Sequence, residues 1–311
     1  YMFVKSANDV IGAVDEEIAN DDMKGYAGMA YASRAHAYYW LTVLYEPVAN
    51  IYTDCSKVLN LTVPIVKPET TGEEISNNPR ASHDDMVAFM LNDLDKAEEL
   101  LANFTPVSKY YPNLAVVYGL KARVYMWNAG VANKGAGNAE SYAKAAEYAR
   151  KAIEASGCEP LTKAQFLDLN NGFNNITSNK AWMWGLHYSP ENMGNLCNFT
   201  GWMSGEADWG YSSLTFPSID KSLYDHMTDI DVRKLLFVAP AGTTLYDQCR
   251  NLVLDMYMMN HPYASLKFRP NQGETSDVQG LCTAFPLMRV EEMYLIEAEA
   301  AAHTSPVEGA A

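Results

Sequence analysis

A repeated pairing of helical segments rich in alanine and aromatic residues limits the folds open to this 311-residue chain. A segment over Leu114–Trp127 is followed by a glycine-rich loop and a second helical segment over Tyr142–Ser156. Small side chains at helical spacing allow neighbouring helices to approach closely. The unit therefore predicts a helical hairpin of the tetratricopeptide kind, with a period stretched by the loop.

Similar helical segments occur elsewhere in the chain. Tyr26–Tyr45 is rich in alanine and aromatic residues, and Val290–His303 has a similar composition. Ser82–Leu101 is amphipathic, with these apolar residues spaced by three and four: Met86, Met90, Leu94, Ala97 and Leu101. We therefore predict a mainly α fold, in which tetratricopeptide-like hairpins form a scaffold over about residues 1–169 and 286–303.

The stretch over about residues 170–285 is expected to be an irregular, loop-rich excursion that carries the ligand-binding face. Its glycines predict turns, with short helices and a few short strands. Trp182 and Trp184 alternate with other residues as in a buried strand, so we expect them to lie in the core. Trp40 and Trp127 lie in alanine-rich helices and are expected to pack internally.

Charge and cysteine content exclude several classes of protein. The chain has 38 acidic and 23 basic residues, a formal charge of −15, which repels nucleic acid but leaves a neutral ligand unaffected. The five cysteines are odd in number, and none has metal-ligand spacing to another. We therefore expect no nucleic acid partner, no disulfide framework, no metal site and no cofactor.

An enzyme is the least favoured class. A glycosidase would need two carboxylates across a cleft, and an enzyme reading would choose them from these residues of one segment: Glu291, Glu292, Glu297 and Glu299. An acidic solvated helix face explains them better, because nothing in the sequence places two of them across a cleft. The scattered histidines complete no catalytic motif. We predict that the chain is not an enzyme.

The two ends of the chain bear on its anchoring. No run of apolar residues is long enough to span a membrane, and Tyr1 is not preceded by a basic leader or by a cysteine that could accept a lipid. We expect residues 1–311 to be a single domain, trimmed at both ends from a longer protein.

Several segments, taken together and in order, resemble the SusD/RagB family of nutrient-binding outer-membrane lipoproteins. Pro286–Ala300 is similar to the family segment P-x-x-R-x-x-E-x-x-L-x-x-A-E-A. Arg34–Tyr39 resembles its early helix, and Pro79–Ala97 resembles its R-x-S and D-L-x-x-A helix. Asp231–Lys234 resembles its D-x-R step, so the resemblance extends from about Ala7 to about His303.

The resemblance implies a function and a location. A protein of this family binds oligosaccharide or polysaccharide on the outward face of the cell outer membrane and performs no catalytic step. It delivers the glycan to a SusC-like TonB-dependent outer-membrane transporter. Its only link to the membrane is a lipid anchor, which the present chain does not contain.

Candidate glycan contacts lie between Asn195 and Tyr211. Sugar recognition combines aromatic faces for the apolar side of the ring with planar polar groups for the hydroxyls. This segment supplies both kinds of group, and we take the following residues as the candidate ligand-binding set: Trp202, Trp209, Tyr211, Asn195 and Asp208. The alternative is that these aromatic residues pack the loops onto the frame.

A second function is compatible with the same sequence. A tetratricopeptide-type scaffold could use the tryptophan-rich region to dock a protein partner, without any glycan. The identity of the glycan also stays open, although the acidic balance disfavours strongly anionic ones.

Overall fold

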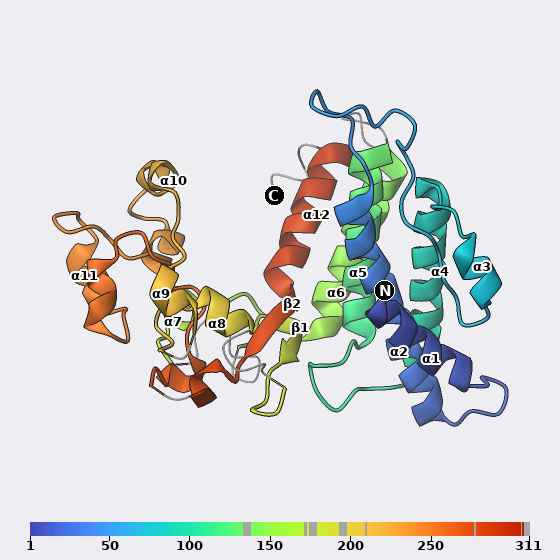
Figure 1. The fold of residues 1–311 in the computed structure, drawn as a ribbon, viewed down its shortest axis with the longest axis horizontal. Coiled ribbons are helices and arrows are strands. Elements are labelled where there is room, and N and C mark those ends of the chain that lie inside the picture. Colours follow the sequence, from blue (N-terminus) through green and yellow to red (C-terminus); the bar gives the residue numbers. More distant parts are fainter. Residues whose placement is uncertain are drawn as a thin grey trace. The chain divides into compact units, whose positions relative to one another are not determined.

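The computed structural model describes residues 1–132, 138–170, 173, 179–192, 198–208, 210–276, 278–305 and 307. The chain forms two compact units, the first made of Tyr1–Gly157 with Val290–Ala311 and the second of Cys158–Arg289. The first unit is built from long helices, whereas the second contains short helices and two strands (Figure 1). The predicted mainly α fold is confirmed.

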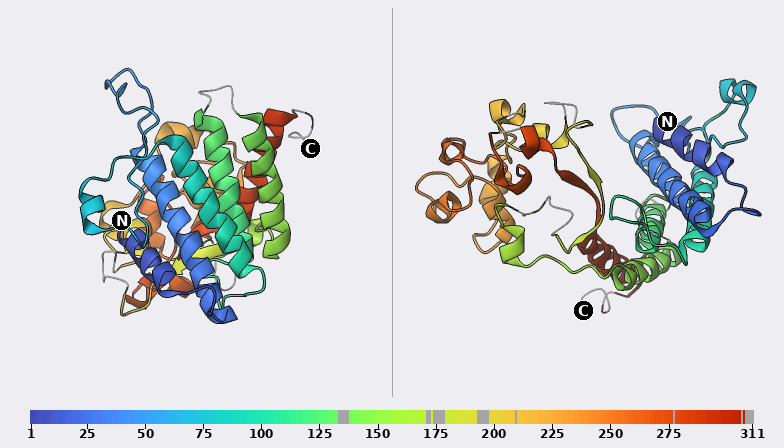
Figure 2. Two further views of the ribbon diagram at one scale, coloured as in Figure 1. Left: turned by 90° about the vertical axis from the view of Figure 1, so that its right-hand side faces the viewer. Right: turned by 90° about the horizontal axis from the view of Figure 1, so that it is seen from below.

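The first unit is an array of paired helices. Its helices are α1 (Met2–Ala13), α2 (Asp21–Tyr45), α3 (Gly72–Ser76), α4 (His83–Leu101), α5 (Leu114–Ala132), α6 (Ala139–Ser156) and α12 (Val290–Thr304). Successive members pack side by side, α1 on α2, α2 on α4, α4 on α5, α5 on α6 and α6 on α12 (Figure 2). The predicted hairpin between Asn113 and Ser156 corresponds to α5 and α6, which Figure 2 shows as neighbours.

The contact between α2 and α4 follows from the residue pattern. All five apolar residues predicted to share one face of α4 are buried: Met86, Met90, Leu94, Ala97 and Leu101. Gly28 of α2 lies so close to this helix that a Cβ atom there would be 2.9 Å from Leu101 Cγ. A glycine at this position therefore lets the two helices approach as the small residues of α2 predict.

A buried ion pair joins α1, α2 and α4. Arg34 donates two hydrogen bonds to the Asp93 carboxylate, Nε to Oδ2 at 2.8 Å and Nη2 to Oδ1 at 2.7 Å. Its third contact, from Nη1 to Asn8 Oδ1, is 2.7 Å long, and Asn8 Nδ2 donates to the carbonyl of Val66 at 3.0 Å. Because each buried polar group has a partner, the network can lie inside the helical array without a large desolvation cost.

His83 links the ends of four helices. Its Nδ1 lies 3.0 Å from Glu46 Oε1 at the end of α2, and its Nε2 lies 3.0 Å from Asn128 Oδ1 of α5. Asn128 Nδ2 donates to Ser141 Oγ of α6 at 2.9 Å, which turns the amide oxygen toward His83. Both ring nitrogens therefore face acceptors, the pattern expected of a protonated imidazolium.

In its described residues, the second unit combines short helices with one two-stranded antiparallel sheet. Its elements are α7 (Lys163–Phe166), β1 (Trp182–His187), α8 (Phe199–Met203), α9 (Ser212–Thr215), α10 (Lys221–His226), η1 (Val232–Leu236), α11 (Tyr246–Arg250), η2 (Met256–Asn260), η3 (Asn271–Gly273), η4 (Val278–Leu281) and β2 (Ala284–Arg289). The strands pair with Trp182 opposite Arg289 and His187 opposite Ala284. Apolar residues from η1, α11, η2 and the loops around them form a core that includes Met258 and Leu266.

The structure confirms the expected burial of two tryptophans and contradicts that of a third. Trp182 and Trp184 are buried in β1, as their alternation predicts. Trp40, expected to pack internally, is instead 47% exposed. Tyr38 is fully buried in α2, and a residue two positions further along a helix points to the opposite side. Trp40 therefore faces outward, with its ring edge against Tyr39 and His36.

Candidate functional site

The second unit exposes a stacked aromatic pair, Trp202 and Tyr211. The ring centroids are 5.1 Å apart and the ring planes are inclined by 28°. Trp202 is 53% exposed and Tyr211 38% exposed, so neither ring is a core residue. Two rings that lie nearly flat against each other at the surface present a wide apolar face.

A close contact between two glycines brings these rings together. A Cβ atom at Gly210 would lie 2.8 Å from the carbonyl oxygen of Gly201 and 2.9 Å from its Cα atom. The two backbones can approach this closely only because residue 210 has no side chain. Trp202 follows Gly201 and Tyr211 follows Gly210, so the backbone contact places the two aromatic residues side by side.

Local hydrogen bonds fix the two segments that carry the rings. Asn198 caps α8, its Oδ1 accepting a hydrogen bond of 2.7 Å from the Gly201 amide. On the other segment, the Ser212 hydroxyl donates to the carbonyl of Ser204, and both residues are buried. The Gly210 amide donates to the carbonyl of Ala207 at 2.9 Å. These contacts hold both segments in a defined conformation.

A buried ion pair supports the turn between the two segments. Glu206 Oε2 accepts a hydrogen bond of 2.6 Å from Arg269 Nη1, and Glu206 Oε1 accepts one of 2.7 Å from the Leu254 amide. Arg269 Nη2 also donates to the carbonyl of Leu252 at 2.5 Å. Burial raises the pKa of the Glu206 carboxyl, and the charge of Arg269 opposes that shift. Glu206 therefore serves as an internal support and not as a surface group for a ligand.

The remaining predicted contacts divide into two groups. The backbone amide of Asp208 donates to the carbonyl of Thr275 at 2.9 Å. The Asp208 side chain is exposed, and the residue lies three positions before Tyr211 in the sequence. Asn195 and Trp209 lie outside the described residues. The structure thus brings Trp202 and Tyr211 together, and ligand contact by all five candidates stays a prediction.

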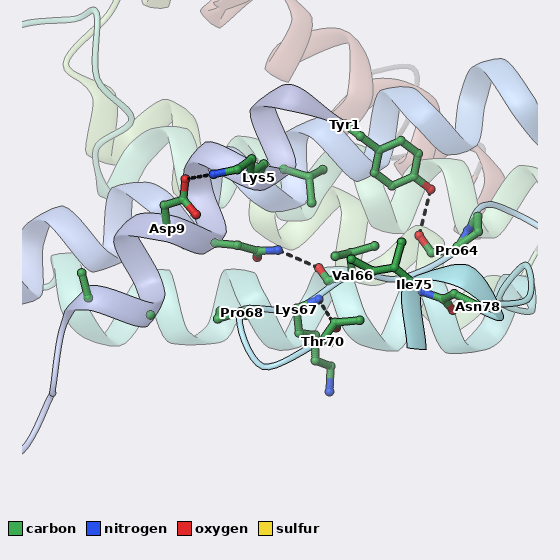
Figure 3. Close-up of a pocket in the computed structure, with 14 residues that line it drawn as sticks. Tyr1, Lys5, Asp9, Pro64, Val66, Lys67, Pro68, Thr70, Ile75 and Asn78 are labelled. Atoms are coloured by element: carbon green, nitrogen blue, oxygen red, sulfur yellow. Dashed lines mark hydrogen bonds and ion pairs between the residues drawn. The ribbon is translucent and has the colours of Figure 1, made fainter. Parts of the chain in front are cut away.

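A pocket that the sequence did not indicate lies in the helical unit. Its volume is about 830 Å³, and it is lined by α1 and by the chain between Pro64 and Asn78 (Figure 3). Tyr1 donates to the carbonyl of Pro64 at 2.9 Å, and Asn78 Nδ2 donates to the carbonyl of Ile65 at 2.7 Å. The only sign of α1 in the sequence is the spacing of Val4, Ala7 and Ile11.

The pocket is less suited to a sugar than the aromatic pair. The polar groups that line it are largely used within the protein, because Lys5 pairs with Asp9 at 2.5 Å and the hydroxyl of Thr70 accepts from the Lys67 amide at 2.9 Å (Figure 3). A hydroxyl-rich ligand needs polar partners that are not already paired. We therefore take Trp202 and Tyr211 as the candidate carbohydrate site.

Three further features of the described residues concern metal binding, membrane spanning and the acidic residues of α12. Within the described residues, no group of three or more His, Cys, Asp or Glu side chains is placed to hold a metal ion. Among the described helices, none is both long and apolar enough to cross a membrane. Two glutamates of α12 have partners in the helical unit, since Glu292 pairs with Arg123 at 2.6 Å and Glu297 with Arg150 at 2.7 Å.

One family model matches the first part of the chain. Residues 1–126 match the family model SusD-like, described as starch-binding associating with outer membrane. No curated protein matches the chain significantly.

Solved structures extend the similarity to the whole fold. A SusD-like carbohydrate binding protein from Bacteroides vulgatus superposes with a TM-score of 0.70 at 22% identity, covering 98% of this chain and 57% of that one. A SusD superfamily protein from Bacteroides thetaiotaomicron gives 0.66 at 17% identity, covering 98% and 62%. A structure solved with xylogluco-oligosaccharide gives 0.64 at 19% identity, covering 98% and 59%. The chain thus spans about three fifths of the length of these proteins. The chain therefore matches a SusD-like family model over residues 1–126 and shares the fold of SusD-like structures over nearly its whole length.

Proposed function

We propose that the chain binds a glycan through the stacked rings of Trp202 and Tyr211, without any catalytic step. The observation that carries this proposal is the exposure of two nearly parallel aromatic rings on a turn held by buried contacts. The apolar face of a sugar ring packs on such a surface, while its hydroxyls need polar partners at the rim. Asp208 supplies one such polar group from the same segment.

The comparisons support carbohydrate binding. The family model is described as starch-binding, and one structural neighbour is described as a carbohydrate binding protein. Another neighbour was solved with a xylogluco-oligosaccharide. SusD-like binding proteins are non-catalytic, and the paired glutamates of α12 agree with a structural role for that helix.

Delivery to a membrane transporter is the second part of the proposal. The family description states an association with the outer membrane. We propose that the protein is held on the outward face of that membrane by a lipid anchor. There it would pass the glycan to a SusC-like TonB-dependent transporter. Copurification of that transporter with the full-length protein from solubilised outer membranes tests this step.

Affinity electrophoresis and calorimetry against a panel of neutral polysaccharides test the binding site. Trp202→Ala removes the more exposed ring of the pair, and Trp40→Ala is the matched control because it removes a tryptophan of similar exposure from the helical unit. Loss of one central aromatic contact weakens binding by about 2 kcal/mol, or roughly 30-fold. Equal affinity of Trp202→Ala and the parent chain, with both folded, would contradict the proposed site.

Docking of a protein partner is the second candidate function. After α2 the chain forms an ordered turn, in which Asn50 Oδ1 accepts from the amides of Tyr52 at 2.8 Å and Thr53 at 3.0 Å. At this turn Ile51 is 91% exposed and Tyr52 89% exposed. An ordered, exposed apolar tip favours a protein contact. Isolation of a soluble partner that Ile51→Ser releases and that glycans do not displace would support this function over the first.

A further inference from the structure

A surface loop between α2 and α4 carries apolar side chains into solvent. It comprises residues 46–61, and Figure 2 shows it extending beyond the ends of the two helices. Ile51 is 91% exposed and Tyr52 89% exposed, although their turn is fixed by hydrogen bonds to Asn50 Oδ1. Compact surface loops of this length whose ends lie close together are frequently functional.

His83, the first residue of α4, contacts both ends of this loop. At the start of the loop, ring Nδ1 lies 3.0 and 3.1 Å from the two oxygens of the Glu46 carboxylate. At the other end, the backbone amide of His83 donates a hydrogen bond of 2.9 Å to the carbonyl of Asn60. One residue therefore joins the two ends, by its side chain at one end and by its main chain at the other.

Arg80 joins the chain on either side of the loop in a second way. Its Nη2 donates to the carbonyl of Tyr45 at 2.5 Å, and its Nε donates to the carbonyl of Thr62 at 2.5 Å. A guanidinium is not deprotonated in proteins, so these contacts do not change with pH. The base of the loop thus has one link that is always charged, at Arg80, and one that can titrate, at His83.

The surroundings of the His83 ring contain two negative charges. The Glu46 carboxylate faces Nδ1 from the end of α2, and Asp84 of α4 adds a second negative charge nearby. The groups of α5 that meet the ring are neutral: the Asn128 amide oxygen, 3.0 Å from Nε2, and the Trp127 ring, with its centroid 4.4 Å away. The side chains of His83 and Glu46 are each only 6% exposed, so water reaches their contact poorly.

Loss of the ring proton weakens this site in two ways. A neutral imidazole has one N–H, so it cannot donate to both Glu46 and the Asn128 amide oxygen. The buried Glu46 carboxylate also loses its charged partner, and an uncompensated buried charge is strongly unfavourable. Movement of the Glu46 end of the loop away from His83 relieves this cost, because it lets water reach the carboxylate.

We propose that His83 is a pH-dependent clasp for residues 46–61, in which the protonated ring holds the two ends of the loop together and the neutral ring releases them. Arg80 keeps the flanking chain joined in both states, so the release is confined to the loop and does not separate α2 from α4. The clasp controls whether Ile51 and Tyr52 are presented in one conformation or in many. It does not depend on glycan binding.

The direction of the pH response follows from the surroundings of the ring. Burial disfavours the charged ring, but the hydrogen bonds to Glu46 and Asn128 and the charges of Glu46 and Asp84 outweigh burial and raise the pKa of His83. The clasp is therefore fully engaged below about pH 6.5, the ordinary pKa of histidine, and is released as the pH rises through the raised pKa of the folded protein.

Amide hydrogen exchange, followed by mass spectrometry of peptides from the whole chain, tests the clasp. Exchange is measured at about pH 5.5 and about pH 8.0, on either side of the ordinary histidine pKa, and is corrected for the intrinsic rate of an unstructured chain at each pH. We expect the protection of residues 47–60 to be about 5- to 10-fold lower at the higher pH, the difference between a charge-assisted and a neutral hydrogen bond. The capping box of Thr71 and Glu74 in α3 contains no histidine and should keep its protection.

Three variants assign the response to the clasp. His83→Gln removes the titrating ring and should show weak loop protection at both pH values, and Glu46→Gln, which removes the buried negative charge, should also abolish the change. His226→Gln is the matched control, because it removes an exposed histidine of the second unit and should behave as the parent chain. Equal loop protection at both pH values in the parent chain overturns the proposal. So does a decrease that persists in folded His83→Gln or Glu46→Gln, or one that α3 shares.

Discussion

Gly210→Ala is the most direct test of how the backbone builds the aromatic site. The added Cβ would lie 2.8 Å from the carbonyl oxygen of Gly201 and 2.9 Å from its Cα atom. Non-bonded carbon atoms rest at about 3.5–4.0 Å, so the two segments must separate by roughly 0.6 Å or more. Forced separations of this kind cost about 1–3 kcal/mol. The movement also pulls Trp202 from Tyr211, and their stacking contributes about 0.5–1.5 kcal/mol.

Urea unfolding followed by tryptophan fluorescence measures the loss of stability, and calorimetry with a bound glycan measures the loss of affinity. Gly205→Ala is the control, because the nearest atoms to its Cβ, at 3.2 Å, belong to the flexible side chains of Met258 and Phe216. We expect Gly210→Ala to lose more stability than Gly205→Ala and to bind glycan less tightly. If both variants unfold at the same urea concentration and bind equally well, the close contact of the two glycines does not determine the site.

Three further predictions concern the helical unit. Asp93→Leu should destabilise the protein by about 3–5 kcal/mol in urea unfolding because it leaves Arg34 buried without its partner, and Arg34→Met combined with Asp93→Leu should recover much of that loss. Burial disfavours a charged His83, but its hydrogen bonds to Glu46 and Asn128 outweigh burial and raise its pKa. His83 should therefore stabilise the protein relative to His83→Gln. This stabilisation should be greatest below about pH 6.5, where an unfolded histidine is also protonated, and should decrease as the pH rises through the raised pKa of His83. Gly25→Ala should lower the urea midpoint, because its Cβ would meet the Phe104 ring.

Each of these predictions has an outcome that contradicts it. A double variant at Arg34 and Asp93 that is no more stable than Asp93→Leu would mean that the buried guanidinium is not the source of the loss. A constant stability difference between His83 and Gln across pH 5–8 would show that folding does not raise the pKa of the imidazole. An unchanged midpoint for Gly25→Ala would show that Phe104 moves aside freely.

The helical frame could be predicted from the sequence because its signals are local. The spacing of Met86, Met90 and Leu94 indicates which side of α4 is buried, and the structure buries all three. α1 was not predicted, although Val4, Ala7 and Ile11 recur at helical spacing. The prediction for Trp40 was wrong because an alanine-rich composition does not say which side of a helix is buried. Tyr38 is buried, and Trp40, two positions later, lies on the opposite side of α2.

The candidate site depends on contacts that the sequence does not encode in any local pattern. The segment Asn195–Tyr211 was selected for its residue types, but only the fold shows that Gly201 and Gly210 touch and thereby stack Trp202 on Tyr211.

The sequence by itself determined the mainly α class, the paired helices and the resemblance to the SusD-like family, because helical periodicity and short motifs are properties of neighbouring residues. Tertiary structure decided which aromatic residues are exposed, which charges are paired and where a ligand can bind. These properties depend on the free energy of contacts between distant segments, and such contacts exist only once the chain has folded.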